Sequence, residues 1–209
     1  MPQAGGHAMG GTSVRWLWWL GLGFVLLAIV GALVYSRSVG SVVSSSEPAV
    51  AGSGVTARQA FAPAAGLAAQ WHEDARLAAV SGRWPAVGTQ AGEQDEWAFQ
   101  LFSPSTQRLA VVVVAGGTAR LVRESVSPYP VSTFSPEEWR VDSDRALQAW
   151  WNRGGRSLVA RRPDTDVAMQ LRMPDEGSEQ PVWTVVGSLA GTETVLIVLV
   201  NATSGALVD

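Results

Sequence analysis

His72, Glu73 and Asp74 form a run of side chains that combines an imidazole with two carboxylates. Such groups carry out general acid–base catalysis or bind a metal ion when they converge on one point. The apolar spacing around them predicts a helix, and three consecutive residues of a helix fan around its axis. We therefore interpret the run as solvated helix surface and predict no metal site there.

A Ser-His-Asp arrangement would have to use His72, because the chain's other histidine lies in a Gly-rich N-terminal tail. No nucleophile-elbow motif accompanies it, and a chain without lysine has no P-loop. Two close acid pairs, Asp142 with Asp144 and Asp164 with Asp166, lack the further ligands of a calcium loop and suit helix caps and turns. The sequence therefore predicts no catalytic, cofactor-binding or metal-binding residues. A weak enzyme built around His72 is the least favoured of three functional hypotheses.

Composition narrows the class of partner. The formal net charge is −3, every basic residue is arginine and no basic cluster occurs, so we expect no nucleic-acid partner. The absence of cysteine excludes disulfides, thiolate catalysis and cysteine zinc sites. It leaves both oxidising and reducing compartments open.

The run from Trp16 to Tyr35 contains 20 residues and no charge, which matches the roughly 20 helical residues that cross a bilayer. Tryptophans crowd its first end and Tyr35 closes the other, as suits the two headgroup layers. A cleaved signal peptide is the main alternative, but its apolar region is usually about 7–15 residues long. We expect an uncleaved span that contacts lipid through residues 16–35. The amino terminus adds to Arg15, and so favours a cytoplasmic N-terminus and a domain outside the cytoplasm.

The rest of the chain divides by composition. A Ser/Gly-rich stretch after the span predicts a flexible tether, and a stretch with three prolines separates two ordered regions. The expected parts are a flexible tail at 1–14, a transmembrane helix at 15–37, a tether at 38–54, a first unit at 55–126, a Pro-rich connection at 127–141 and a second unit at 142–209.

The first unit begins with a predicted helix. Leu67, Trp71, Ala75 and Ala78 follow a helical spacing that starts at Pro63 and stops at Gly82. Alternation and β-branched runs then predict strands at 97–101, 109–114 and 120–123, the first two forming a hairpin.

The second unit repeats this order. Asp142-Ser143-Asp144 predicts a helix start and Gly154-Gly155 its end, with strands at 167–173, 182–186 and 195–200. Trp150 and Trp151 invite a carbohydrate-stacking interpretation, but with Ala146 and Leu147 they complete an apolar stripe, which favours core packing.

Two strand tryptophans suggest that the units are related. Trp97 precedes Leu109 by 12 positions, and Trp183 precedes Val195 by the same 12. A duplicated helix-plus-hairpin unit explains both spacings. We therefore expect Trp97 and Trp183 to be equivalent core residues that face the helices of their own units.

The stretch from Val195 to Leu207 resembles the end of a PepSY domain, in which a strand runs into an Asp-x-x-Thr-Gly turn. Asn201 and Ser204 stand at the Asp and Thr positions, and Gly205 matches. The resemblance implies an α+β, PepSY or cystatin-like duplicated domain outside the cytoplasm, of the non-enzymatic kind linked to restraining peptidases or to sensing at the cell envelope. It transfers no binding residues.

We therefore expect a membrane-anchored binding or regulatory domain with a protein partner. The alternative is a structural accessory subunit of a larger membrane complex, held in part through glycines of the span, Gly21, Gly23 and Gly31.

Overall fold

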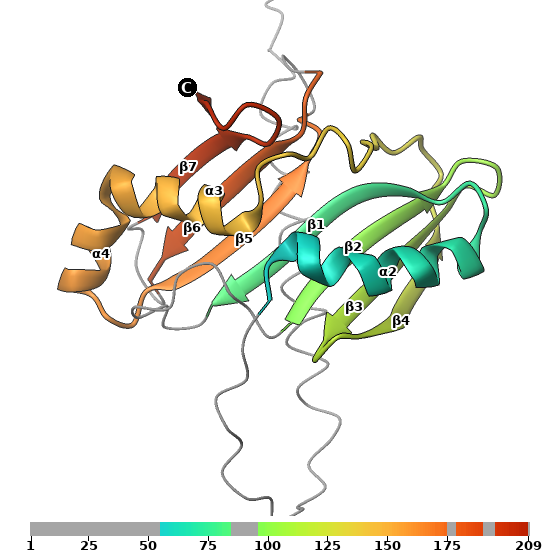
Figure 1. Ribbon diagram of the computed structural model, residues 1–209, viewed down its shortest axis with the longest axis horizontal. Coiled ribbons are helices and arrows are strands. Elements are labelled where there is room, and N and C mark those ends of the chain that lie inside the picture. The colour runs from blue at the N-terminus through green and yellow to red at the C-terminus, as the bar shows by residue number, and fades with distance from the viewer. Residues whose placement is uncertain (1–54, 85–95, 175–178, 190–194, 209) are drawn as a thin grey trace, which may run out of the picture. The chain divides into compact units, whose positions relative to one another are not determined.

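The computed structural model describes residues 55–84, 96–174, 179–189 and 195–208 of the chain. All of them belong to the unit Ala51–Asp209. The tail, span and tether predicted at 1–54 lie outside the described residues. The described part is an α+β fold, as predicted: eight antiparallel strands form one sheet, with helices lying against it (Figure 1).

Helix α2 (Ala57–Trp71) begins earlier than predicted because of a capping box. Thr56 Oγ1 accepts the backbone N–H of Gln59, and Gln59 Oε1 accepts the backbone N–H of Thr56 at 2.9 Å. Pro63, predicted in the first turn, therefore lies in the helix interior. The apolar spacing missed this start because the capping signal precedes it.

The predicted end of this helix at Gly82 is also wrong. The chain is already extended at His72, Ala75 follows a turn, and strand β1 (Arg76–Trp84) takes up Ala78 and Gly82. Strand β1 pairs with a neighbour on each side and is largely buried. A strand inside a sheet loses the polar alternation of a half-buried strand, so its small apolar residues can imitate helical spacing.

The next three strands confirm the predicted hairpin and third strand, each with longer ends. Strands β2 (Glu96–Ser103) and β3 (Arg108–Ala115) pair antiparallel over their full length. Strand β4 (Thr118–Val126) pairs with β3 and contains mostly exposed residues. These strands form one end of the sheet (Figure 1).

The second helical segment starts as predicted but does not stop at the glycines. Asp142 caps helix α3 (Ser143–Trp150), and a π-helical turn, η1 (Trp151–Gly155), leads into helix α4 (Arg156–Arg161). Gly154 takes φ +125° within the turn, and the chain then resumes α-helical geometry. The two glycines thus kink the segment and do not end it.

Trp150 gives a physical reason for the kink. A Cβ atom on Gly155 would lie 2.3 Å from the Trp150 ring, and one on Gly187 would lie 2.2 Å from it. The ring therefore occupies space that only glycine leaves open on both sides. Its Nε1 donates to the Leu196 carbonyl at 3.1 Å, and Trp151 is buried as well, which confirms the core interpretation of this pair.

The second half completes the sheet. Strands β5 (Asp166–Arg172), β6 (Val182–Ser188) and β7 (Val195–Asn201) match the predicted strands, and a two-residue strand, β8 (Leu207–Val208), was not predicted. The strand order is β4-β3-β2-β1-β5-β6-β7-β8. Strands β1 and β5 meet antiparallel in the middle, so each half runs outward from the centre in the same sequence order.

Corresponding features of the halves recur at one spacing. The first residues of α2 and α3 are 86 positions apart, as are Trp97 of β2 and Trp183 of β6. Trp97 pairs with Val114 of β3, and Trp183 pairs with Val200 of β7, again 86 positions further on. The two hairpins thus have the same register.

Trp97 and Trp183 confirm the prediction of equivalent core residues. Both are fully buried, and their rings meet edge to face with centroids 6.4 Å apart. Trp97 Nε1 donates to the Val55 carbonyl at 2.9 Å, and Trp183 Nε1 donates to the Val141 carbonyl at 2.8 Å. Each acceptor directly precedes the N-cap of the helix in the same half, so each indole fixes the start of its own helix against the sheet.

The two helix starts also bind one another. An oxygen of Asp142 accepts the backbone N–H groups of Ser143 at 2.7 Å and of Arg58 at 3.1 Å. Ser143 Oγ accepts the N–H of Ala57 at 3.1 Å. One carboxylate thus satisfies free N–H groups of both helices and couples the halves.

Candidate functional site

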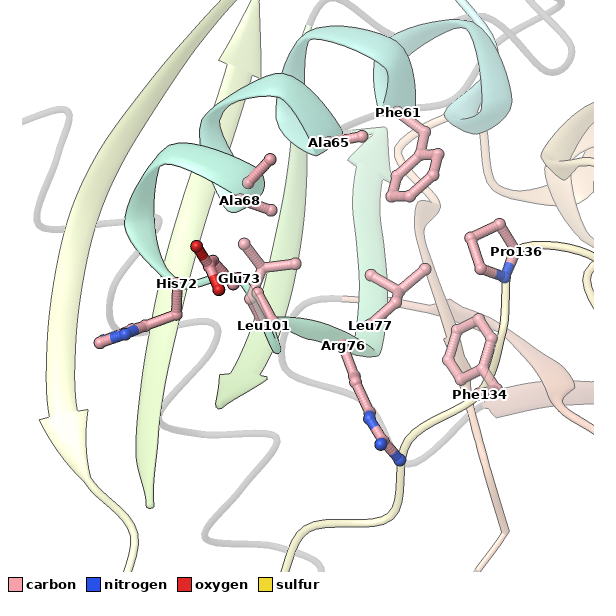
Figure 2. Close-up of a pocket in the computed structure, with 12 residues that line it drawn as sticks. Phe61, Ala65, Ala68, His72, Glu73, Arg76, Leu77, Leu101, Phe134 and Pro136 are labelled. Atoms are coloured by element: carbon pink, nitrogen blue, oxygen red, sulfur yellow. The ribbon is translucent and has the colours of Figure 1, made fainter. Parts of the chain in front are cut away.

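An apolar groove of about 250 Å³ opens beside the C-terminal half of α2 (Figure 2). Leu77 of β1 and Leu101 of β2 contribute from the sheet, and Phe61 lines it from α2. Phe134 and Pro136, from the Pro-rich connection, form the opposite wall. We call this hollow the α2 groove.

The fold holds the far wall of the groove in place. The backbone N–H of Phe134 donates to the Leu77 carbonyl at 2.9 Å, and the Phe134 side chain is buried. Phe61 packs against Phe99 with ring centroids 5.8 Å apart and against Trp139 at 6.0 Å. The groove is thus built from ordered contacts of four parts of the chain: α2, β1, β2 and the Pro-rich connection.

The helical wall of the α2 groove belongs to the first half. It includes Ala65, Ala68 and Ala69, whose small side chains leave the space open. The residues 86 positions later fall in the π-helical turn η1, Trp151–Gly155, where Trp150 fills the neighbouring space. The second half therefore has packed aromatic side chains where the first half has the helical wall of the groove.

Charged side chains stand at the groove's edge. Glu73 and Arg76 are exposed, and Figure 2 shows His72 and Arg76 extending away from the apolar side chains in different directions. The prediction that His72, Glu73 and Asp74 lie on a helix surface is wrong, because α2 ends at Trp71 and these residues form the turn before β1. The arrangement offers apolar contact with a polar margin.

Asp74 has a structural role in this turn. Its carboxylate accepts a hydrogen bond from the Ser103 hydroxyl at 2.7 Å and another from the Ser105 backbone N–H at 2.7 Å. These two bonds lower the pKa of Asp74 from 3.8 to about 2, and the bond from Ser103 has the largest effect. Asp74 thus joins the α2–β1 turn to the β2–β3 turn as a stable anion.

Three acids of the two close pairs in the sequence, Asp142, Asp144 and Asp166, lie at a helix start or form an ion pair. Asp142 caps α3, Asp144 lies in its first turn, and Asp166 pairs with Arg83 at 2.5 Å. Asp164 lies in the turn before β5. Among the described residues, no group of three or more His, Cys, Asp or Glu side chains could hold a metal ion.

The C-terminal turn forms as its sequence predicts. Asn201 Oδ1 accepts the N–H groups of Thr203 and Ser204, each at 2.9 Å, and Gly205 takes φ +79°. The side chain of Asn201 thereby closes the turn with local hydrogen bonds, and Gly205 supplies the left-handed residue.

Sequence reasoning missed the groove residues of the connection. It treated the residues between the units as a link without further role, although this stretch contains three aromatic residues, Tyr129, Phe134 and Trp139. A large apolar side chain in such a segment needs a partner surface, and Leu77 provides it. Large aromatic residues in an otherwise polar, proline-rich segment were the available signal.

No protein-family model, curated protein or solved structure matches this chain. None of the described helices is long and apolar enough to cross a membrane, and the Trp16–Tyr35 run lies outside the described residues.

Proposed function

We propose that this chain is a single-pass membrane protein whose C-terminal domain lies outside the cytoplasm and binds a protein partner without catalysing a reaction. The uncharged run Trp16–Tyr35 supports the anchor through its length and its aromatic ends. The tail before it is cytoplasmic. The domain that follows presents its binding surface at the cell envelope.

The α2 groove is the observation that carries the binding role. Its volume of about 250 Å³ is below the roughly 300–1,000 Å³ of small-molecule pockets. A groove of that size suits one or two apolar side chains of a protein partner, with the charged margin around Glu73 and Arg76 orienting it. This supports a protein partner over a metabolite.

The proposal includes a duplicated, PepSY-like domain. The constant spacing of 86 residues between helix starts and between core tryptophans supports a duplication. The Asn201–Gly205 turn supports the family resemblance, which implies a role in restraining a peptidase or in sensing at the envelope. Among the described residues, Trp150 fills the place in the second half that corresponds to the α2 groove, which suits a duplicated domain in which one copy kept a binding surface and the other became a scaffold.

Site-specific photocrosslinking tests the binding role. A benzophenone amino acid at Ala69, which is exposed and lines the groove, should give one discrete adduct in irradiated cells. The same probe at Ser157, exposed on α4, is the matched control and should not give that adduct. Adding Ala65→Glu, which places a charge in the groove wall, should weaken the Ala69 adduct.

Equal adducts from Ala69 and Ser157, or no adduct at Ala69, would contradict the binding role. A partner that copurifies at fixed stoichiometry in mild detergent would instead favour a structural accessory subunit of a membrane complex.

A further inference from the structure

Strand β4 ends the sheet of the described residues, and no described strand covers its outer edge. It is nine residues long, all but Ala119 are exposed, and Leu121, Val122 and Val126 have exposed fractions of 42%, 49% and 68%. At the other end, β7 is partly covered by β8. Proteins commonly blunt their edge strands, because a free row of N–H and C=O groups pairs with other chains.

The side chains of β4 add a charge pattern. A register shift between Val111 and Val112 of β3 lets Arg120 pair with Val113 and Arg123 with Val111. Positions 111 and 113 share one face of β3, so both arginines project from that same face of the sheet, opposite α2. Neither forms an ion pair with another described residue.

The negative charge of β4 lies on the opposite face and is already engaged. Glu124 pairs with Arg108 at 2.6 Å and accepts a hydrogen bond from Trp71 Nε1 of α2 at 3.1 Å. The face of β4 turned away from the helix is therefore cationic and has no acid of its own strand to balance it.

We propose that the β4 edge binds an extended, acidic peptide segment of the protein partner as a ninth strand of the sheet. This inference names the class of partner segment and rests on the binding role proposed above. Backbone hydrogen bonds to the edge give affinity, and acidic residues opposite Arg120 and Arg123 give specificity. Arg120 and Arg123 pair with Val113 and Val111 of β3, which are two positions apart. A regular strand of the partner on the other side of β4 would therefore place acidic residues opposite both arginines at positions i and i+2 of the partner.

Charge selects this occupant over a second copy of the chain. Antiparallel pairing of two β4 strands would bring four guanidinium groups together on one face. Like charges on neighbouring strands destabilise a sheet. An acidic strand converts the same groups into ion pairs.

Fluorescence anisotropy with a defined peptide tests the inference on the full chain in mild detergent. The probe is a labelled, end-capped nine-residue peptide in which Glu alternates with Val or Thr. We expect it to bind, with affinity falling as salt rises, and we expect the Glu→Lys peptide not to bind. The double variant Arg120→Glu, Arg123→Glu should have an affinity for the acidic peptide that is lower by roughly tenfold or more, and it should bind the Lys peptide. Arg145→Glu with Arg156→Glu, two exposed arginines elsewhere, is the charge-matched control and should bind like the wild type.

Backbone methylation separates strand addition from simple charge attraction. Successive N–H groups of a strand point to opposite edges, so we compare a peptide N-methylated at every odd position with one N-methylated at every even position. The peptide whose methyl groups replace the N–H groups that face β4 should not bind, and the other peptide should still bind. Equal binding by the two methylated peptides, equal binding by the two double variants, or no binding of the acidic peptide would overturn the inference. If the peptide experiment fails but the Ala69 photocrosslinking adduct still forms, the proposed binding role is retained and only the assignment of the β4 edge is wrong.

Discussion

Replacement of Gly187 by alanine should destabilise the domain strongly although it adds a single methyl group. The new Cβ would lie 2.2 Å from Trp150 Cζ2, whereas carbon atoms in contact normally stay about 3.5–4.0 Å apart. The fully buried ring must therefore move by more than about 1 Å. The Gly155 backbone lies close to other atoms of the same ring, since a Cβ added there would be 2.3 Å from Trp150 Cε3, so the ring has little room to move.

The expected cost has two parts. Overpacking of a buried site costs about 1–3 kcal/mol, and a displaced ring also weakens the hydrogen bond from Trp150 Nε1 to the Leu196 carbonyl, worth about 1 kcal/mol. A total of about 3 kcal/mol corresponds to a melting temperature lowered by about 6–12 °C in a domain of this size.

Gly66→Ala is the matched control. Gly66 lies inside α2, and a Cβ there would meet nothing within 4 Å. Alanine in a helix interior is favoured over glycine by roughly 0.5–1 kcal/mol, so this variant should melt at the same or a higher temperature. Both variants are measured by thermal unfolding of residues 55–209, followed by near-ultraviolet circular dichroism. A Gly187→Ala melt equal to that of the wild type would refute the packing of Trp150 between two glycines.

Three further outcomes follow from the fold. Residues 55–209 should unfold in one cooperative transition without the first 54 residues, and a broad, non-cooperative melt would count against this domain boundary. Trp97→Ala and Trp183→Ala should each cost about 3–5 kcal/mol, because both indoles are fully buried and each holds a helix start; a near-native melt for either one would show that the halves are not equivalent. The pKa of Asp74 is lowered to about 2, so its stabilising effect should be complete above about pH 4 and lost as the pH falls through about 2. The difference in melting temperature between wild type and Asp74→Asn should therefore shrink between these two pH values. A constant difference would contradict the assigned hydrogen bonds.

Local sequence patterns predicted six of the eight described strands and the buried tryptophans correctly for definite reasons. Trp97, Phe99 and Leu101 alternate along β2 and belong to the core, as do Val198 and Val200 in the β-branched run before Asn201, so the local pattern reports the residues that face the core. The equal spacing to the returning strand reflects an identical hairpin register in the two halves. The start of α3 follows from Asp142, whose capping role is also local.

The errors arose where distant parts of the chain decide the structure. Ala78 and Gly82 lie in a strand because β2 and β5 pair with it on both sides, and no local pattern reports that. At the Gly154–Gly155 kink, Trp150 packs against Gly187 of β6 and donates to the Leu196 carbonyl of β7, and both residues are distant in sequence. The α2 groove depends on contact between Phe134 and Leu77, which are 57 positions apart in sequence, roughly the span of a whole unit.

Single-cysteine labelling measures the proposed membrane topology most directly. The chain has no cysteine, so Ser13→Cys in the tail and Ser157→Cys on exposed α4 each introduce one thiol. With a membrane-impermeant maleimide applied to intact cells, we predict that the thiol at 157 reacts at once and the thiol at 13 reacts only after lysis, while both variants stay in the membrane fraction. Reaction at 13 with protection at 157, or recovery of both variants in the soluble fraction, would contradict an anchored domain outside the cytoplasm.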